Sequence, residues 1–244
     1  MEQQAELVVV GFQEIVELSP QQIMSTDPAQ RQLWEKAVLT CLNINATQRG
    51  GDEYILLRSG QLVGAALMIF VRSSAIANIK NVEGSLKKTG MSGVAGNKGA
   101  VAIRLDYAST RLCFVTAHLA AGFSNYEERN HDYKTITHGL RFQRGRTIDN
   151  HDSVIWLGDF NYRIELENEK VRKLIEIGDL QTLYDNDQAR VPPTFSQEET
   201  ADKSIVQLNL QMMAGLTFPY YSEAMLTFDP TYKFDVGRDI YDTS

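Results

Sequence analysis

The chain has 244 residues, of which 43% are hydrophobic and 23% are charged, and its formal net charge at pH 7 is −7. These proportions are those of an ordinary globular protein, and they exclude disordered, collagen-like and coiled-coil chains. The acidic charge disfavours general binding to duplex nucleic acid, which needs a basic face. Because the sequence holds no internal repeat, low-complexity tract or linker rich in proline, glycine and serine, we expect a single domain.

Signals for targeting and redox chemistry are sparse. The longest apolar run, residues 63–71, is far shorter than the roughly 20 residues that span a bilayer. The opening residues, MEQQAELVVV, place acids before a short apolar run, which differs from a signal peptide. The two cysteines, Cys41 and Cys113, form neither a disulfide framework nor a metal-ligand spacing. We therefore expect a cytoplasmic protein in which Cys113 is a buried thiol.

Five short apolar or β-branched runs predict strands. In chain order they are residues 7–12 (LVVVGF), 65–72 (AALMIFVR), 100–105 (AVAIRL), 112–117 (LCFVTA) and 153–157 (SVIWL). Their continuity indicates strands that are buried on both faces or lie in stacked sheets. Residues 106–111 (DYASTR) suit an antiparallel hairpin with a longer loop between the third and fourth runs.

Three helices are expected between and after these strands, at about residues 28–42, 127–142 and 168–177. Asp27 and Pro28 suit the cap and first turn of the first helix. Gly178 suits the residue that follows the end of the third. Helices and strands in this irregular order indicate an α+β or mixed α/β fold.

The most informative segment is VIWLGDFNYR, residues 154–163, in which an apolar strand runs into Asp159 and Asn161. Two residues apart in extended chain, these side chains point to the same face. The carboxylate would deprotonate or orient a water, and the amide would hold that water or a phosphate oxygen. The alternative is an ordinary turn, since glycine, aspartate and asparagine are common turn residues.

Two other strands are followed by residues that suit a reactive site. His118 ends the run LCFVTA and lies level with Asp159 if both strands belong to one stack; otherwise it is a buried core histidine. Glu14 follows the run LVVVGF, at the rim of the same sheet. A carboxylate there suits Mg²⁺, which usually takes one or two protein carboxylates and keeps water or phosphate as its other ligands. A solvated strand end is the alternative for Glu14.

Two further segments suit an anionic ligand. GVAGNKGA, residues 93–100, would bring a glycine-rich backbone and the charge of Lys98 close to a phosphate. PTYKFD, residues 230–235, offers Tyr232 and Lys233 for hydrogen bonding and pairing with an anion. Taken alone, the first is neither of the common nucleotide-binding loops, and the second is equally an ordinary surface loop.

The segments FQE, GNKGA, TAHLAAG, WLGDFNYR and PTYKFD occur in this order, with ERNHDY at residues 128–133 between the histidine and aspartate motifs. Together they closely resemble the inositol polyphosphate 5-phosphatases, and most of all the synaptojanin-type catalytic domain. The resemblance runs from about Leu7 to the end of the chain. It implies an α+β fold, a two-sheet β-sandwich flanked by helices, as in the DNase I-like endonuclease/exonuclease/phosphatase superfamily.

The resemblance also implies an activity and its partners. The expected reaction is Mg²⁺-dependent removal of the 5-phosphate from phosphoinositides such as phosphatidylinositol 4,5-bisphosphate, or from soluble inositol polyphosphates, by in-line attack of water. The expected partners are that head group and, peripherally, an anionic membrane. Apart from the resemblance, Lys80, Lys87 and Lys88 precede the glycine-rich segment and would contact such a membrane; a solvated surface is the alternative for them. No nucleic acid is expected.

Roles for the site residues follow from the resemblance, position by position. Glu14 is expected to bind the metal, Asp159 to activate the attacking water, Asn161 to orient it, and His118 to stabilise the phosphoryl oxygens. The residues expected to bind substrate are Asn97 and Lys98 in the phosphate pocket, Asn130 and Arg163, and Tyr232 and Lys233 beside the neighbouring 4-phosphate.

The chain departs from the family pattern at both termini. The family's opening Thr-Trp-Asn motif is absent, and so are its closing Pro-Ala-Trp-Cys/Thr-Asp-Arg and Ser-Asp-His motifs. We therefore expect residues 1–244 to form one catalytic domain that is incomplete at both ends, with unpaired sheet edges that promote aggregation. Loss of one phosphate-stabilising histidine would lower the rate by about 100- to 1000-fold.

Two alternatives to a 5-phosphatase stay open. One is a truncated, non-catalytic form that binds phosphoinositide head groups without releasing phosphate. The other is a Mg²⁺-dependent nuclease of the same superfamily, which the acidic charge and the GNKGA and PTYKFD segments disfavour.

Overall fold

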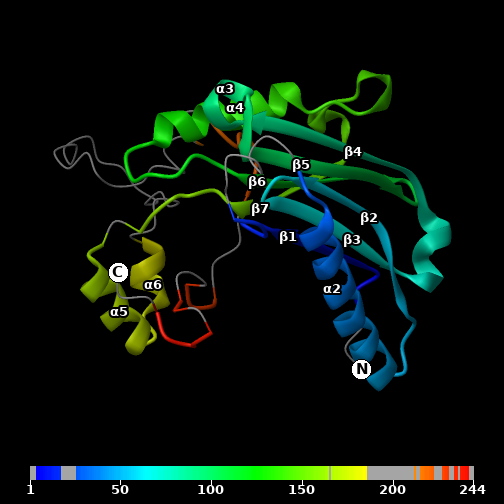
Figure 1. Ribbon diagram of the computed structural model, residues 1–244, viewed down its shortest axis with the longest axis horizontal. Coiled ribbons are helices and arrows are strands. Elements are labelled where there is room, and N and C mark those ends of the chain that lie inside the picture. Colours follow the sequence, from blue (N-terminus) through cyan, green and yellow to red (C-terminus); the bar gives the residue numbers. More distant parts are fainter. Residues whose placement is uncertain are drawn as a thin grey trace. The chain divides into compact units, whose positions relative to one another are not determined.

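The computed structural model describes residues 4–17, 26–164, 166–185, 212, 215–222, 227–230, 234–235 and 237–241 (Figure 1). The chain divides into two compact units, Met1–Asn161 and Tyr162–Ser244. The first unit holds every strand named below, and the second holds two short helices, α5 (Asn168–Glu176) and α6 (Leu180–Asp185). Tyr232 and Lys233 lie outside the described residues.

Two sheets form the first unit. The smaller has the order β1–β3–β2 and is antiparallel throughout, with strands β1 (Leu7–Phe12), β2 (Tyr54–Leu62) and β3 (Ala65–Arg72). The larger has the order β4–β5–β6–β7, with strands β4 (Ile79–Thr89), β5 (Ala95–Tyr107), β6 (Thr110–His118) and β7 (Ser153–Asp159). The pairing of β6 with β7 is parallel, so the carboxyl ends of both strands meet at one edge of the sheet.

The two sheets pack face to face around an apolar core. Leu67 and Ile69 of β3 belong to one buried cluster with Val101 and Ile103 of β5. At Gly11 of β1 the sheets approach so closely that a Cβ atom would lie 2.7 Å from the side chains of Thr116 and Leu157. Two inner sheet faces that exclude water in this way make a β-sandwich.

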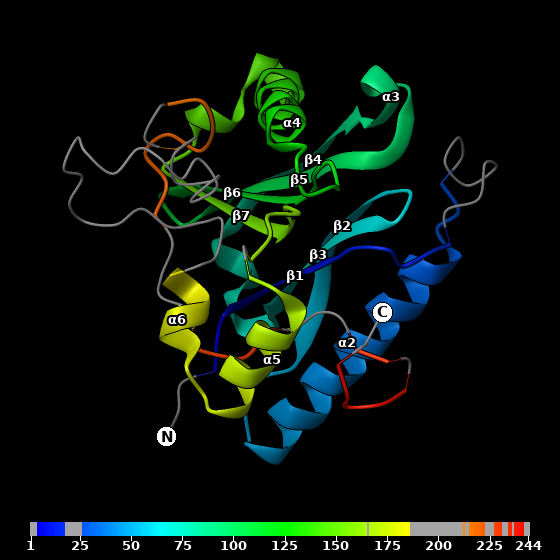
Figure 2. The same cartoon turned by 90° about the vertical axis from the view of Figure 1, so that its left-hand side faces the viewer.

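Helices cover the outer faces of both sheets. Helix α2 (Ala29–Gln48) packs its apolar side on the β1–β3–β2 sheet, and helix α4 (Tyr126–Gly139) packs Ile136 on the β4–β7 sheet. Figure 2 shows the two sheets between these helices. A single turn, α3 (Gly90–Gly93), joins β4 to β5, and three 3₁₀ turns lie at Ser73–Asn78, Gln143–Gly145 and Ile148–Asn150. The predicted α+β sandwich flanked by helices is confirmed.

All five predicted strands are present, and the first two have the predicted bounds. The expected longer loop between β5 and β6 is wrong, because Tyr107 pairs with Thr110 and only Ala108 and Ser109 form the turn. A backbone φ of 51° at Ala108 allows this tight reversal. Strands β2 and β4 were not predicted.

The three predicted helices are present with shifted ends. Helix α2 begins after Asp27, whose Oδ1 accepts a hydrogen bond from the N–H of Ala29 (2.9 Å), and it continues past Leu42 to Gln48. Gly178 follows α5 with a φ of 70°, the left-handed conformation expected after a helix. Among the described residues, no helix combines the length and the apolar character needed to cross a bilayer.

Candidate functional site

The parallel strands β6 and β7 end level with each other. Ala117 pairs with Gly158 and His118 pairs with Asp159, and the distance between His118 Nε2 and Asp159 Oδ2 is 3.5 Å. Gly158 allows this approach: its φ is 128°, and a Cβ atom there would lie 2.1 Å from the carbonyl oxygen of Ala117. The expectation that His118 and Asp159 lie level is confirmed.

Lys98 reaches the same point from the other side of β6. Gly99 of β5 pairs with His118, and Lys98 Nζ lies 2.5 Å from His118 Nε2. The strand predicted at residues 100–105 begins earlier than expected, at Ala95, and so includes Asn97 and Lys98. Lys98 is therefore presented by a strand whose pairing fixes its position.

Asn97 lies beside Lys98 but packs toward α3. A Cβ atom on Gly90 would lie 2.2 Å from Asn97 Oδ1. This oxygen is buried and has no hydrogen-bond partner among the described residues. Position 90 therefore has no room for a side chain, and the predicted contact of Asn97 with phosphate stays a prediction.

The environment of His118 favours the neutral imidazole. The residue is only 4% exposed. Burial lowers the pKa of His118, the positive charge of Lys98 lowers it further, and the charges of Asp159 and Glu14 oppose this shift. Because the ammonium of Lys98 can only donate, Nε2 of the neutral ring accepts and the ring proton lies on Nδ1.

The Asp159 carboxylate is oriented by the turn that follows it. Its Oδ1 accepts a hydrogen bond from the backbone N–H of Asn161 (2.9 Å), while the side chain remains 49% exposed. A carboxylate that is fixed by one oxygen and open to solvent is suited to accept a proton from water.

The interpretation that Asn161 shares a strand face with Asp159 is wrong. Strand β7 ends at Asp159, and Asn161 has a φ of 59°, which is left-handed and not extended. Its Nδ2 donates to the carbonyl oxygen of Leu119 (3.0 Å), and the N–H of Leu119 donates to the carbonyl of Asp159 (3.0 Å). Asn161 therefore joins the chain beyond the ends of β6 and β7, and its water-orienting role stays a prediction.

Glu14 follows β1 in a constrained backbone conformation. Its φ is 57°, and its neighbours hold it there: Gln13 Nε2 donates to Thr116 Oγ1 (2.9 Å), and the N–H of Ile15 donates to the carbonyl of Gly64 (3.1 Å). A non-glycine residue with positive φ often marks a functional site. The expectation that Glu14 lies at the rim of the same sheet as His118 and Asp159 is wrong, because β1 belongs to the β1–β3–β2 sheet. The Glu14 carboxylate is exposed, and its charge raises the pKa of His118 from across the sandwich.

The donors at these strand ends suit a hard divalent cation better than a closed metal centre. Within the part of the chain that the structure describes, no group of three or more His, Cys, Asp or Glu residues is arranged to hold a metal. An exposed carboxylate such as Glu14 fits Mg²⁺ or Ca²⁺, because these ions take oxygen ligands and retain water or phosphate.

The remaining predicted residues are Asn130, Arg163, Tyr232 and Lys233. Asn130 is buried on α4, next to residues that hold the segment following His118. Arg163 belongs to the second unit. The predicted roles of these two residues, and of Tyr232 and Lys233, stay predictions.

Sequence reasoning missed two buried charged residues of α4, Arg129 and Asp132. A signal was present, because their spacing places them on the same helix side as the apolar Tyr133 and Ile136. Charged residues on an apolar helix side are seldom buried without partners. Both bind the segment that follows His118.

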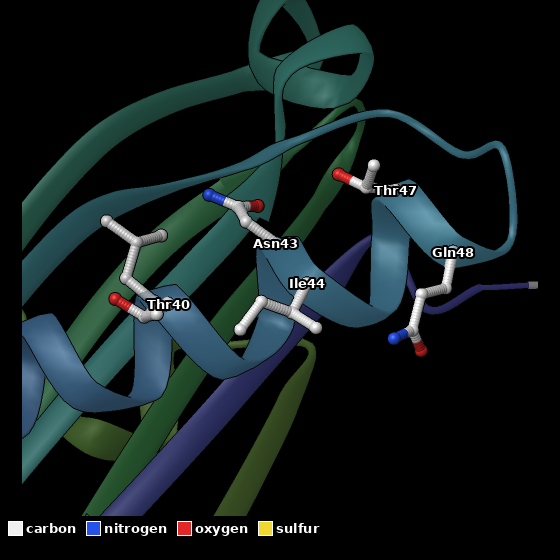
Figure 3. Close-up of a pocket in the computed structure, with 6 residues that line it drawn as sticks. Thr40, Asn43, Ile44, Thr47 and Gln48 are labelled. Atoms are coloured by element: carbon white, nitrogen blue, oxygen red, sulfur yellow. The ribbon is translucent and has the colours of Figure 1, made fainter.

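A hollow elsewhere on the first unit holds none of these residues. It lies along α2 and is lined by Leu39, Thr40, Asn43, Ile44, Thr47 and Gln48 (Figure 3). All six come from one helix, which leaves no second element to enclose a ligand.

The structural class of the protein is a two-sheet sandwich flanked by helices, with a lysine, a histidine and a carboxylate at adjacent strand ends. The family described as "Endonuclease/Exonuclease/phosphatase family 2" matches residues 1–244, and the chain belongs to this family.

Within that family the chain is homologous to the inositol polyphosphate 5-phosphatase domain of synaptojanin-type proteins. It is 56% identical over 240 residues to inositol-1,4,5-trisphosphate 5-phosphatase 1 of Schizosaccharomyces pombe, covering 98% of this chain and 20% of the relative. It is 44% identical over 243 residues to phosphatidylinositol 4,5-bisphosphate 5-phosphatase INP51 of Saccharomyces cerevisiae, covering 100% and 23%. The chain thus spans about a fifth of the length of these relatives.

A solved structure supports the same relationship. The inositol polyphosphate 5-phosphatase domain of SPsynaptojanin, in complex with inositol (1,4)-bisphosphate and calcium ion, matches with a TM-score of 0.80 and 54% sequence identity. The match covers 98% of this chain and 62% of that chain.

Proposed function

We propose that this chain removes the 5-phosphate from inositol phosphates and phosphoinositides in a reaction that depends on a divalent metal ion, with Mg²⁺ as the physiological ion. The observation that carries the proposal is the meeting of Lys98, His118 and Asp159 at one edge of three paired strands. The activities named for the relatives, and the inositol bisphosphate bound to the related domain, support the same substrate class.

Lys98 and His118 are suited to bind the transferring phosphoryl group. The ammonium of Lys98 lies within hydrogen-bonding distance of His118 Nε2. A phosphate dianion beside the ring adds negative charge, which favours the protonated imidazole that donates a hydrogen bond. Two cationic donors at this point would stabilise the charge that develops in the transition state.

Asp159 is suited to accept a proton from the attacking water. Asp159 is the register partner of His118 on β6. The N–H of Asn161 orients its exposed carboxylate through a hydrogen bond to Oδ1. Glu14 would hold the metal ion, with further ligands from water and substrate phosphate. Such an ion, when bound, neutralises phosphate charge and acts as a Lewis acid.

An anionic membrane is the proposed location of the lipid substrates, on the cytoplasmic leaflet, which carries acidic lipids. At the tip between β4 and β5, Met91 is 79% exposed and Val94 is 60% exposed. Lys88, just before this tip, is partly exposed, with its Nζ 3.4 Å from the carbonyl oxygen of Val94. Apolar side chains next to a cation suit the interface between head groups and acyl chains.

The central experiment measures phosphate release from a short-chain phosphatidylinositol 4,5-bisphosphate and from inositol 1,4,5-trisphosphate, with Mg²⁺ and with EDTA. We expect Mg²⁺-dependent release that falls at least about 100-fold in Asp159→Asn. Asp152→Asn is the matched control, because Asp152 lies at the opposite end of β7, in an exposed pair with Arg111. Release that is indifferent to EDTA or to Asp159→Asn would contradict the proposal.

The membrane contact has a separate test. Met91→Asp should reduce hydrolysis in vesicles that contain phosphatidylserine and leave hydrolysis of the soluble trisphosphate unchanged. Leu33→Asp, at an exposed position on α2, should change neither. Equal losses on both substrates in Met91→Asp would contradict a membrane role for the tip. Substrate binding without phosphate release would support the non-catalytic alternative.

A further inference from the structure

The backbone that follows His118 has no regular structure, yet its first residues are buried. Leu119 is fully buried and Ala120 nearly so. A buried backbone group that leaves a strand needs a new hydrogen-bond partner. The N–H of Leu119 donates to the carbonyl of Asp159, and the carbonyl of Leu119 accepts from Nδ2 of Asn161. The groups after Leu119 are bound by two charged side chains of α4.

Arg129 binds three carbonyl oxygens of this segment. Its Nη1 donates to the carbonyls of Ala120 (3.2 Å) and Gly122 (2.8 Å), and its Nη2 donates to that of Phe123 (3.4 Å). The side chain is completely buried. A planar guanidinium with fixed donors thus determines the path of residues 120–123.

Asp132 binds the same segment from the next turn of the helix. Its Oδ2 accepts the N–H of Ala120 at 3.0 Å, and the residue is buried. Burial raises the pKa of Asp132, and the hydrogen bond from the N–H of Ala120 acts against that rise. Asp132 therefore holds Ala120 by its N–H, while Arg129 holds the same residue by its carbonyl.

We propose that Arg129 and Asp132 are positioning residues, which hold the segment after His118 so that the imidazole keeps its place between Lys98 and Asp159. Ala120 is bound by both residues, through its carbonyl and its N–H, and lies two residues after His118. A displacement of about 1 Å at a reacting group can cost about 100-fold in rate. The inference rests on the proposed phosphatase function for its kinetic readout alone.

The test compares Asp132→Asn, Asp132→Leu and Arg129→Lys with wild type. Asp132→Asn retains an oxygen acceptor for the N–H of Ala120, and Asp132→Leu removes it. We expect kcat to fall about 10- to 100-fold in Asp132→Leu and Arg129→Lys, with KM within about threefold, and most of kcat to return in Asp132→Asn. Glu127→Gln, on the exposed side of the first turn of α4, is the control.

Amide hydrogen exchange gives a readout that needs no activity. Exchange at Ala120 should be faster in Asp132→Leu and near wild type in Asp132→Asn, while Val115 in the centre of β6 stays protected in both. Unchanged kcat in a variant with fast exchange at Ala120, or a rise in KM alone, would overturn the proposal. If Asp132→Leu does not fold, Arg129→Lys decides by the same criteria. An inactive wild type with these exchange rates would instead contradict the phosphatase function.

Discussion

Gly158 of β7 and Ala117 of β6 lie so close that the hydrogen of Gly158 cannot be replaced by a methyl group without moving backbone. The missing Cβ would lie 2.1 Å from the carbonyl oxygen and 2.9 Å from the nitrogen of Ala117. Since both contacts are to backbone, no side-chain rotation relieves them. The next register pair is His118 and Asp159. The close approach at Gly158 therefore determines how near these two side chains lie to each other.

Gly158→Ala is therefore expected to destabilise the fold and to separate His118 from Asp159. We expect a loss of about 3 kcal/mol, combining ~1–2 kcal/mol for the positive φ with ~1–3 kcal/mol for the forced shift. Gly145→Ala is the control, because Gly145 also has a positive φ (70°) but nothing within 4 Å of its Cβ position. It should cost only about 1 kcal/mol. Urea unfolding of both variants checks this, and equal losses would refute the close-contact argument.

Lys98→Met is expected to raise KM and lower kcat, with a combined loss in kcat/KM of about 100-fold or more. Methionine keeps much of the apolar stem and removes the ammonium that lies beside His118. Lys87→Met is the control, because the Lys87 stem packs against Gly139 of α4 rather than at the site. Steady-state kinetics on inositol 1,4,5-trisphosphate distinguish the two. Comparable values of kcat/KM for both variants would show that Lys98 does not bind the phosphate.

The two thiols should differ sharply in reactivity. Cys41 is exposed on α2, whereas Cys113 is buried in β6 and burial raises the pKa of its thiol to about 12. Because the thiolate is the reactive form, Cys113 should resist thiol reagents in the folded protein. Titration with Ellman's reagent at pH 8 should label wild type once and Cys41→Ser hardly at all, until urea is added. Fast labelling of native Cys41→Ser would show that the core around Cys113 opens readily.

The free energy of unfolding should depend on pH, because a buried arginine is hydrogen-bonded to a histidine. Arg104 is fully buried; its Nε donates to His151 Nε2 (3.1 Å), its Nη1 donates to the carbonyl of Asn81 (2.8 Å), and its Nη2 pairs with Asp106. His151 Nδ1 donates to the carbonyl of Ile148 at 2.8 Å. The ring can accept from Arg104 only while it is neutral.

Burial lowers the pKa of His151 below its ordinary 6.5; the hydrogen bond to the carbonyl of Ile148 opposes this shift, and the charges of Arg104 and Arg111 add to it. The unfolded state therefore binds this proton more readily, and the free energy of unfolding should decrease as pH falls from about 7 through 6.5 toward 5. His118 shifts in the same direction, so the comparison is with His151→Gln, which should show a smaller decrease. Urea unfolding at several pH values measures this. The same decrease in wild type and variant would exclude His151 as a source.

The sequence predicted the strands whose apolar runs are continuous and missed those that contain a bulge. In β2 the pairing shifts between Leu56 and Arg58, and in β4 between Lys80 and Glu83. Each bulge inserts a residue and interrupts the two-residue alternation that identifies a half-buried strand. β5 was predicted short because the residues before Ala100 are glycine, asparagine and lysine, which read as a loop until the partner strands are known.

For the site, the ends of apolar runs indicated His118, Asp159 and Glu14, because a strand end fixes where the next side chain emerges. The proximity of Lys98 to His118 depends on the register of β5 with β6, which sequence spacing does not encode. The turn at Asn161 depends on a hydrogen bond to Leu119, a partner far away in the chain. Interactions of this kind arise from tertiary structure and are invisible in local patterns.

The parallel pairing of β6 with β7 also has a consequence for the order of folding. Strands β4, β5 and β6 are joined by short connections and pair as neighbours, so they can form early from local contacts. Strand β7 joins only after residues 119–152, including α4, have crossed back over the sheet. Pairing of β5 with β6 brings Lys98 beside His118, whereas Asp159 reaches them only when β7 is paired. The residues at this edge of the sheet are therefore assembled by two kinds of contact, one local in the chain and one that spans the long crossover.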